Sequence, residues 1–280
     1  MCYYNGIKVS RGEYIRLKDL EVFVGKNREW INCDLNQGPL YNQPYPIVKA
    51  TDTGPELKLM EWGYIPEESK WPFLKSREEL AKWRFMYTTL NATCEGLFVN
   101  DKGKTSMYAG AAQYRRCLVP STGYWEWRHI KQVGKSGKIL KDPIKIPYHL
   151  VVTDHQENNP FYMAGIWGTW VSEETGEVVE NFTIVTTVAN ELSAQVHNAK
   201  KRMPTILNED LAQEWMFGKL SKDDIMDIAK TQYETKEMDA WTVAKGFQTA
   251  FNPRDKFAYA GLPPLGSDEP FNPYQSLSLF

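Results

Sequence analysis

Short runs of apolar, β-branched and aromatic residues, separated by polar turns, fill the middle of this chain. Such runs are typical of strands. We therefore expect strands at residues 57–65, 116–119, 123–128, 147–153, 163–171 and 182–187. Residues 36–56 are rich in Gly, Pro, Asn and Asp, so we expect irregular loops there, with one short strand near 47–49.

Capping signals and helical spacing predict several helices. An S-x-x-E pattern at residues 10–13 precedes apolar positions at helical spacing, which predicts a helix over 10–25. The same signal at 76–79 predicts a short helix that ends near Phe85. Further helices are expected to begin near Ala189, Asn208 and Ser221.

Strands and helices alternate without a regular βαβ order, which favours an α+β fold. We find no linker, repeat or low-complexity tract, and the part after Trp241 reads as loop-rich. The sequence therefore predicts one domain over residues 2–265, followed by a C-terminal tail over 266–280.

Composition narrows the class of protein. The 280 residues are 42% hydrophobic and 24% charged, as in soluble globular proteins. No run of 18 apolar residues and no secretory signal is visible, so we expect a cytoplasmic protein without membrane contact. Four cysteines without a CxxC pair make disulfides and a zinc site unexpected, and we expect no cofactor.

Overall charge does not indicate nucleic-acid binding, because the formal net charge is −2. Any such binding requires a local basic patch. Residues 128–145 hold six basic side chains and one Asp, which we interpret as a basic surface hairpin around Gly134 and Gly137. The alternative is an ordinary solvated loop.

Cys2 is the first candidate for chemistry. Removal of Met1 would leave an α-amine and a thiol on one residue, with pKa values of about 7.7–8.0 and 8.5. Such a 1,2-aminothiol condenses with an aldehyde to an imine and then to a five-membered thiazolidine. The alternative is a cysteine without function near a chain terminus.

Glu126 lies between two tryptophans in the predicted strand Gly-Tyr-Trp-Glu-Trp. Alternation along a strand places Tyr124 and Glu126 on one face, with Trp125 and Trp127 on the other. A poorly solvated carboxylate there would suit general acid–base catalysis. An ordinary exposed glutamate is the alternative.

Two further polar residues are candidates. His197 follows a predicted helix and precedes the basic run Lys200, Lys201 and Arg202, so it could transfer protons while the cations hold phosphate. A surface histidine at a helix C-terminus is the alternative. Asn91 could orient a substrate or tether the N-terminus, although asparagine is common in loops.

These residues occur in one order: Cys2, Asn91-Ala92, then RRCLVPxxGYWEW at 115–127, Pro147-Tyr148, AGIW at 164–167, FTIVTT at 182–187, His197 and Arg202-Met203-Pro204. That order resembles the SRAP (SOS response-associated peptidase) family over residues 2 to about 216. The resemblance implies a single SRAP-like domain with a mixed, barrel-like sheet core and flanking helices.

The resemblance also implies a chemistry. Members of this family act on abasic sites in single-stranded DNA, whose ring-opened sugar exposes an aldehyde. Cys2 would form a thiazolidine crosslink, Asn91 would position the reacting group, Glu126 would transfer protons, and His197 would assist ring opening. Met1 would be removed by self-processing or by an aminopeptidase. No metal is implied, and we expect a monomer.

The chain departs from the family pattern where arginines are usual. Tyr3-Tyr4 follows Cys2, Thr93 follows Asn91-Ala92, and the usual His-x-Arg is stretched across residues 197–202. The predicted DNA contacts are Asn42, Trp71, Thr93, Lys200, Lys201, Arg202 and Arg254. Two alternatives remain open at this stage: a cysteine peptidase that acts on other peptides, and a non-catalytic module that binds single-stranded DNA.

Overall fold

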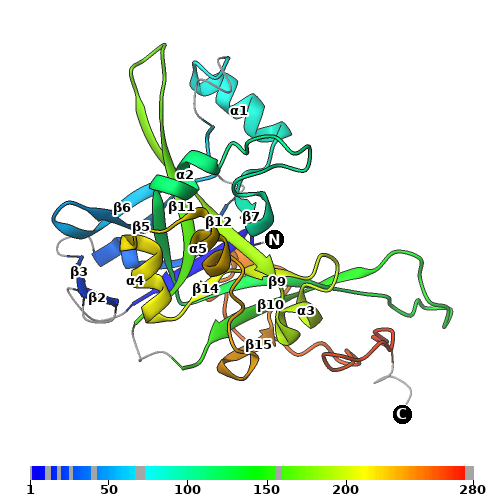
Figure 1. Cartoon of the computed structure of the whole chain (residues 1–280). Coiled ribbons are helices and arrows are strands. Elements are labelled where there is room, and N and C mark those ends of the chain that lie inside the picture. The colour runs from blue at the N-terminus through cyan, green and yellow to red at the C-terminus, as the bar shows by residue number, and fades with distance from the viewer. Residues whose placement is uncertain are drawn as a thin grey trace.

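Two β-sheets form the framework, and the larger one closes into a barrel (Figure 1). The structure is a computed structural model that describes residues 2–9, 14–17, 20–24, 28–38, 43–66, 73–154 and 159–274. The barrel strands are β5 (Pro44–Thr51), β6 (Gly54–Trp62), β8 (Arg116–Ser121), β11 (Phe161–Val171) and β12 (Val178–Val188).

The barrel strands are hydrogen-bonded in the order β12-β6-β5-β8-β11, and β11 pairs with β12 to close the ring. Three short strands extend it: β7 (Asn91–Thr93), β13 (Arg202–Pro204) and β14 (Ile206–Leu207). The sheet is mixed, because β12 runs parallel to β6 and β7 whereas its other pairings are antiparallel. The predicted α+β fold with a barrel-like core is confirmed.

The second sheet carries the N-terminus. Its antiparallel order is β15-β10-β9-β1-β4. The bounds are β15 (Met238–Thr242), β10 (Ile144–Val152), β9 (Gly123–Ile130), β1 (Tyr4–Lys8) and β4 (Asn32–Gln37). Because β1 lies between β9 and β4, the chain enters the fold through the interior of this sheet.

Helices cover the barrel on several sides (Figure 1). They are α1 (Arg77–Met86), α2 (Ala109–Tyr114), α3 (Glu191–Val196), α4 (Glu209–Phe217) and α5 (Lys222–Ala229), with 3-10 turns η1 (Arg28–Ile31), η2 (Cys94–Gly96), η3 (Thr235–Glu237) and η4 (Phe247–Thr249). The predicted capping box at Ser76 is present, Ser221 also forms one at the predicted start of α5, and Asn190 and Asn208 cap α3 and α4. Local side-chain-to-backbone bonds therefore fix where these helices begin.

The helix predicted over residues 10–25 is wrong. The described part of that segment forms the hairpin of β2 (Tyr14–Leu17) and β3 (Leu20–Phe23). Ile15 and Val22 are paired across it, and both are buried. Burial of this β-branched pair against the core outweighs the local helical spacing.

The loops predicted over residues 36–56 are also wrong in large part, since β5 and β6 form a long hairpin there. Prolines are disfavoured in central strands because they lack an N–H donor. Pro44 and Pro46 are accommodated because β5 pairs with its second neighbour, β8, only at Val48 and Lys49. Most of the proline-containing half of β5 therefore has one partner strand.

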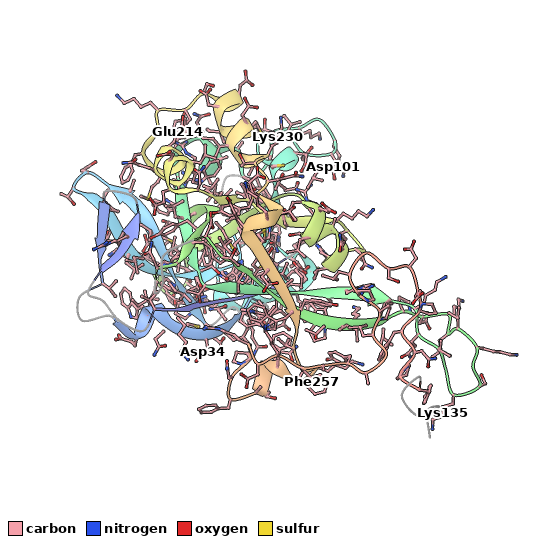
Figure 2. All side chains as sticks on the ribbon, turned by 90° about the horizontal axis from the view of Figure 1, so that it is seen from below. Asp34, Asp101, Lys135, Glu214, Lys230 and Phe257 are labelled. Atoms are coloured by element: carbon pink, nitrogen blue, oxygen red, sulfur yellow. The ribbon has the colours of Figure 1, made fainter. Side chains whose placement is uncertain are left out.

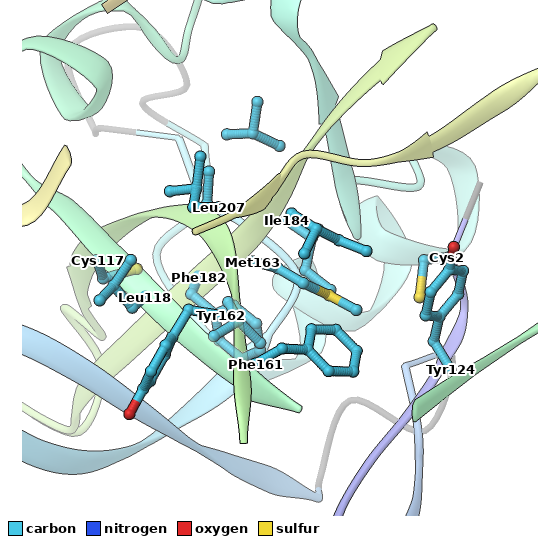
Figure 3. Close-up of a cluster of buried hydrophobic side chains, with 14 of the residues drawn as sticks. Cys2, Cys117, Leu118, Tyr124, Phe161, Tyr162, Met163, Phe182, Ile184 and Leu207 are labelled. Atoms are coloured by element: carbon cyan, nitrogen blue, oxygen red, sulfur yellow. The ribbon is translucent and has the colours of Figure 1, made fainter. Parts of the chain in front are cut away.

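A continuous apolar core fills the barrel and extends to the second sheet. Figure 3 shows Met163, Phe182 and Ile184 inside it, with Cys2 at one margin beside the ring of Tyr124. Cys2 is thereby part of the core. Among the described residues, no helix is long and apolar enough to cross a membrane.

The close packing of β1 makes a prediction about Gly6. A Cβ atom there would come within 2.5 Å of the backbone oxygen of Asp34 on β4. We expect Gly6→Ala to lower the free energy of unfolding by about 1–3 kcal/mol, because overpacking forces the backbone to move. Urea denaturation measures this, with Gly246→Ala as control, since no atom lies within 4 Å of a Cβ at Gly246. Equal stabilities of the two variants would contradict the packing of β1.

His149 generates a second prediction. Its ring is buried between Trp125 and Trp241, and burial lowers its pKa to about 3. The unfolded chain takes up this proton near pH 6.5, so stability falls as the pH drops from about 6.5 towards 3, at about 1.4 kcal/mol per pH unit. His149→Phe keeps the aromatic contacts and should remove this part of the slope. Denaturation between pH 6.5 and 4 tests it, and an unchanged slope in the variant would refute it.

Candidate functional site

Cys2 is held at the junction of the two sheets. Its carbonyl oxygen accepts a hydrogen bond of 2.8 Å from Asn91 Nδ2, at the start of β7. Its thiol lies 3.5 Å from the carbonyl oxygen of Tyr4, and the residue is 0% exposed. Of the two roles considered for Asn91, the tether of the N-terminal segment is therefore present in the structure.

The surroundings of Cys2 keep its sulfur protonated. Burial raises the pKa of the thiol well above its usual range, and the negative charge of Glu126 raises it further. A neutral thiol is a weak nucleophile compared with a thiolate. Chemistry at this sulfur therefore requires a neighbouring group that accepts its proton.

Glu126 is such a neighbour. The predicted alternation on β9 is confirmed: Trp125 and Trp127 pack with Phe247 on one face, and Tyr124 belongs to the main core on the other. Glu126 is 4% exposed, so the alternative of an ordinary exposed glutamate is wrong. A buried carboxylate can exchange protons with nearby groups without competition from bulk water.

His197 faces Glu126 from the end of α3. Its Nε2 lies 3.9 Å from Glu126 Oε2, and the residue is 7% exposed, which excludes the surface alternative. Its Nδ1 lies 2.8 Å from the carbonyl oxygen of Arg202. Since a carbonyl only accepts, Nδ1 carries a proton, and Nε2 is the ring nitrogen that faces Glu126.

Asn198 is a site residue that the sequence reasoning missed. Its side chain accepts a hydrogen bond of 2.9 Å from the backbone N–H of His129 and donates one of 2.8 Å to the carbonyl of the same residue. These two bonds fasten the turn after His197 to β9. No local pattern marks Asn198, because its partner lies 69 positions away.

A pocket of about 420 Å³ opens beside these groups. Aromatic and basic side chains share its wall. The lining residues are Tyr3, Tyr4, Glu126, Trp127, His129, Lys145, His197, Ala199 and Lys200. Such a wall can stack an unpaired base and attract a phosphate.

The predicted DNA contacts divide into separate groups. Lys200 lines the pocket, and Lys201 is exposed on the same turn. Arg202 is instead bound to Glu95, with N–O distances of 2.8 and 3.0 Å, and to the carbonyl oxygen of Thr186. Its charge is thus already neutralised within the protein.

The remaining predicted contacts lie elsewhere or outside the described residues. Thr93 is exposed but lines a different pocket, of about 370 Å³, whose other lining residues lie between Gly96 and Tyr108. Arg254 lies 3.3 Å from Asp34, on the Trp125 face of the second sheet and opposite to Glu126. Asn42 and Trp71 fall outside the described residues. The structure therefore brings Lys200, but neither Thr93 nor Arg254, to the pocket beside Glu126.

The described residues contain no group of three His, Cys, Asp or Glu side chains that could hold a metal ion. What the site does contain is a thiol, a carboxylate and an imidazole within one buried corner. A thiol next to groups of this kind has the components that nucleophilic catalysis with proton transfer requires.

Several known proteins are similar to this chain in sequence. The abasic site processing protein YoqW of Bacillus subtilis is 26% identical over 186 residues, which cover 66% of this chain and 68% of that protein. The abasic site processing protein YedK of Escherichia coli is 26% identical over 196 residues, 70% of each chain. The abasic site processing protein HMCES of Xenopus tropicalis is 25% identical over 204 residues, 69% of this chain and 56% of that one.

Solved structures and a family model complete the comparison. A crystal structure of a protein from Bacteroides thetaiotaomicron has a TM-score of 0.68 at 29% identity and covers 91% of this chain and 97% of its own. A protein from Bordetella bronchiseptica at 18% identity, with a TM-score of 0.61, shares the fold. The family model described as SOS response associated peptidase (SRAP) matches residues 10–249. Because this match spans most of the chain, the protein belongs to the SRAP family.

Proposed function

We propose that this protein captures abasic sites in single-stranded DNA through a covalent bond to Cys2. The observation that carries the proposal is that Glu126 and His197 line one pocket with aromatic and basic walls, while the charge of Glu126 also acts on the buried thiol of Cys2. The relatives named abasic site processing proteins support the same substrate. An abasic site in its open form offers the aldehyde that a 1,2-aminothiol requires.

The reaction proceeds in two bond-forming steps. The α-amine of Cys2 attacks the aldehyde carbon, and loss of water gives an imine. The sulfur then adds to the imine carbon while its proton moves to the nitrogen, which closes the thiazolidine. Glu126 and His197 relay the protons, a role that matters because the buried thiol is otherwise protonated. Asn91 holds the Cys2 carbonyl and so fixes the direction of both nucleophiles.

The walls of the pocket suggest how the DNA strand binds. Tyr3, Tyr4 and Trp127 offer faces on which the bases beside the lesion stack. Lys200 and Lys145 offer charge to the flanking phosphates. Of the basic run at residues 200–202, we assign phosphate binding to Lys200. Arg202 instead holds the His197 ring through its backbone carbonyl.

A free α-amine requires removal of Met1, and we propose that the site performs this step itself. The sulfur of Cys2 attacks the Met1 carbonyl carbon, which transfers the acyl group from nitrogen to sulfur. Water then hydrolyses the thioester, which releases methionine and restores the thiol. Glu126 takes the thiol proton and returns it to the leaving amine.

Replacement of the thiol tests the covalent step. We expect Cys2→Ala to abolish a heat-resistant protein–DNA band on a denaturing gel with single-stranded DNA that contains one abasic site, because alanine offers no sulfur to close the ring. Cys33→Ala is the control and should crosslink normally, since Cys33 lies on β4, away from the pocket. A Cys2→Ala protein that still forms the stable band would disprove the proposal, and cleavage of unrelated peptides would favour a peptidase.

Self-processing makes a separate prediction about Glu126. We expect Glu126→Gln to retain Met1 and to crosslink about 10²–10⁴-fold more slowly, because the proton acceptor is lost. Intact-mass analysis of the purified protein measures Met1, with the exposed Glu214→Gln as a matched control. Complete loss of Met1 from Glu126→Gln would show that a cellular aminopeptidase removes it instead.

A further inference from the structure

The β9–β10 hairpin continues beyond its sheet as a projecting arm, residues 131–145 (Figures 1 and 2). Figure 2 shows Lys135 at the far end of the arm, remote from Asp34 and Glu214. The arm is ordered by backbone bonds from Gly134 to Lys138 and from Leu140 to Gln132. Gly137 has a φ of 76°, a left-handed conformation that suits glycine in the tight turn.

The arm carries concentrated positive charge. Five lysines are exposed along it and form no ion pair with any described residue: Lys131, Lys135, Lys138, Lys141 and Lys145. One acidic residue, Asp142, lies in the same segment, and Asp268 and Glu269 lie on the neighbouring C-terminal segment. For a protein with a net charge of −2, this segment is a local basic patch.

The base of the arm is fixed rather than hinged. Arg128 is buried, and its guanidinium donates hydrogen bonds of 2.7, 2.9 and 3.1 Å to the carbonyls of Pro263, Pro264 and Ser267. The backbone of Phe271 bonds to Lys131 and Val133 along the edge of the arm. Arg128 is therefore structural and does not belong to the basic surface, but it holds the lysines in a set direction.

The arm begins where the pocket ends. Lys145 and His129 lie opposite each other on β10 and β9, and both line the pocket. From His129 to Lys135 an extended strand covers about 20 Å, a length that spans several phosphates of a DNA strand. Residues 131–145 contain no aromatic side chain, so they offer charge to phosphates but no ring on which bases stack.

We infer that the arm binds the phosphodiester backbone of the DNA strand where it continues beyond the lesion. The inference rests on the proposed function of the pocket, because it takes the orientation of the strand from a lesion held beside Cys2. The pocket would hold the damaged nucleotide and its neighbours, and the arm would supply affinity that does not depend on base sequence.

The test removes four arm lysines that do not line the pocket, in Lys131→Ala/Lys135→Ala/Lys138→Ala/Lys141→Ala. The noncovalent affinity for single-stranded DNA is measured in a Cys2→Ala background at several salt concentrations. With about ten nucleotides on each side of the lesion, we expect about tenfold weaker binding and a log–log salt slope that is smaller by about 3. With about two nucleotides on each side, we expect unchanged affinity, because the strand ends before it reaches the arm.

The matched control replaces four exposed lysines elsewhere: Lys102, Lys219, Lys230 and Lys245. If this control weakens the long substrate as much as the arm variant does, the effect is one of net charge, and the inference fails. It also fails if the arm variant weakens short and long substrates alike. Crosslinking by the wild-type protein is measured separately. If the arm variant binds the long substrate more weakly but the wild-type protein forms no crosslink, the inference about the arm holds and the proposed chemistry fails.

Discussion

The hydrogen bond from Asn91 to the carbonyl of Cys2 joins the start of the second sheet to the barrel. Asn91 is itself placed by the parallel pairing of β7 with β12, so the barrel wall sets the position of the chain's second residue. Chain ends are usually the least ordered part of a domain. Cys2 is nevertheless buried at the junction of the two sheets, with Asn91 and Glu126 close to it.

Burial of Cys2 raises the pKa of its thiol and so lowers the reactivity of the sulfur. Because the thiol is removed from water, its ionisation is disfavoured. The protonated sulfur is slow to oxidise or to react with electrophiles other than the substrate. Glu126 and His197, to which the proposed function assigns the proton transfer, approach each other from different elements of the fold. Under the proposed function, this division ties the reactivity of the thiol to a substrate that occupies the pocket lined by Glu126 and His197.

Sequence patterns that involve residues close together in the chain predicted helix starts and strand alternation correctly. The capping boxes at Ser76 and Ser221 are contacts between near neighbours, and the aromatic strand around Glu126 carries its alternation in the sequence itself. Errors arose where distant partners decide the outcome. The 14–23 segment follows strand pairing rather than helical spacing, and neither the Asn198–His129 bonds nor the Arg202–Glu95 pair can be derived from spacing. The sequence therefore pointed to candidate residues that the structure brings close together, Glu126 and His197 among them, but not to the network that orients them.

The turn between His197 and Arg202 has a consequence for how such a site can diverge. Asn198 fastens one end to β9, and Glu95 with Thr186 fastens the other, so the imidazole is held from both sides. The residues in between, 199–201, carry none of that restraint through their side chains. The charge that these side chains present to the pocket can therefore change without loss of a side-chain contact that holds the imidazole.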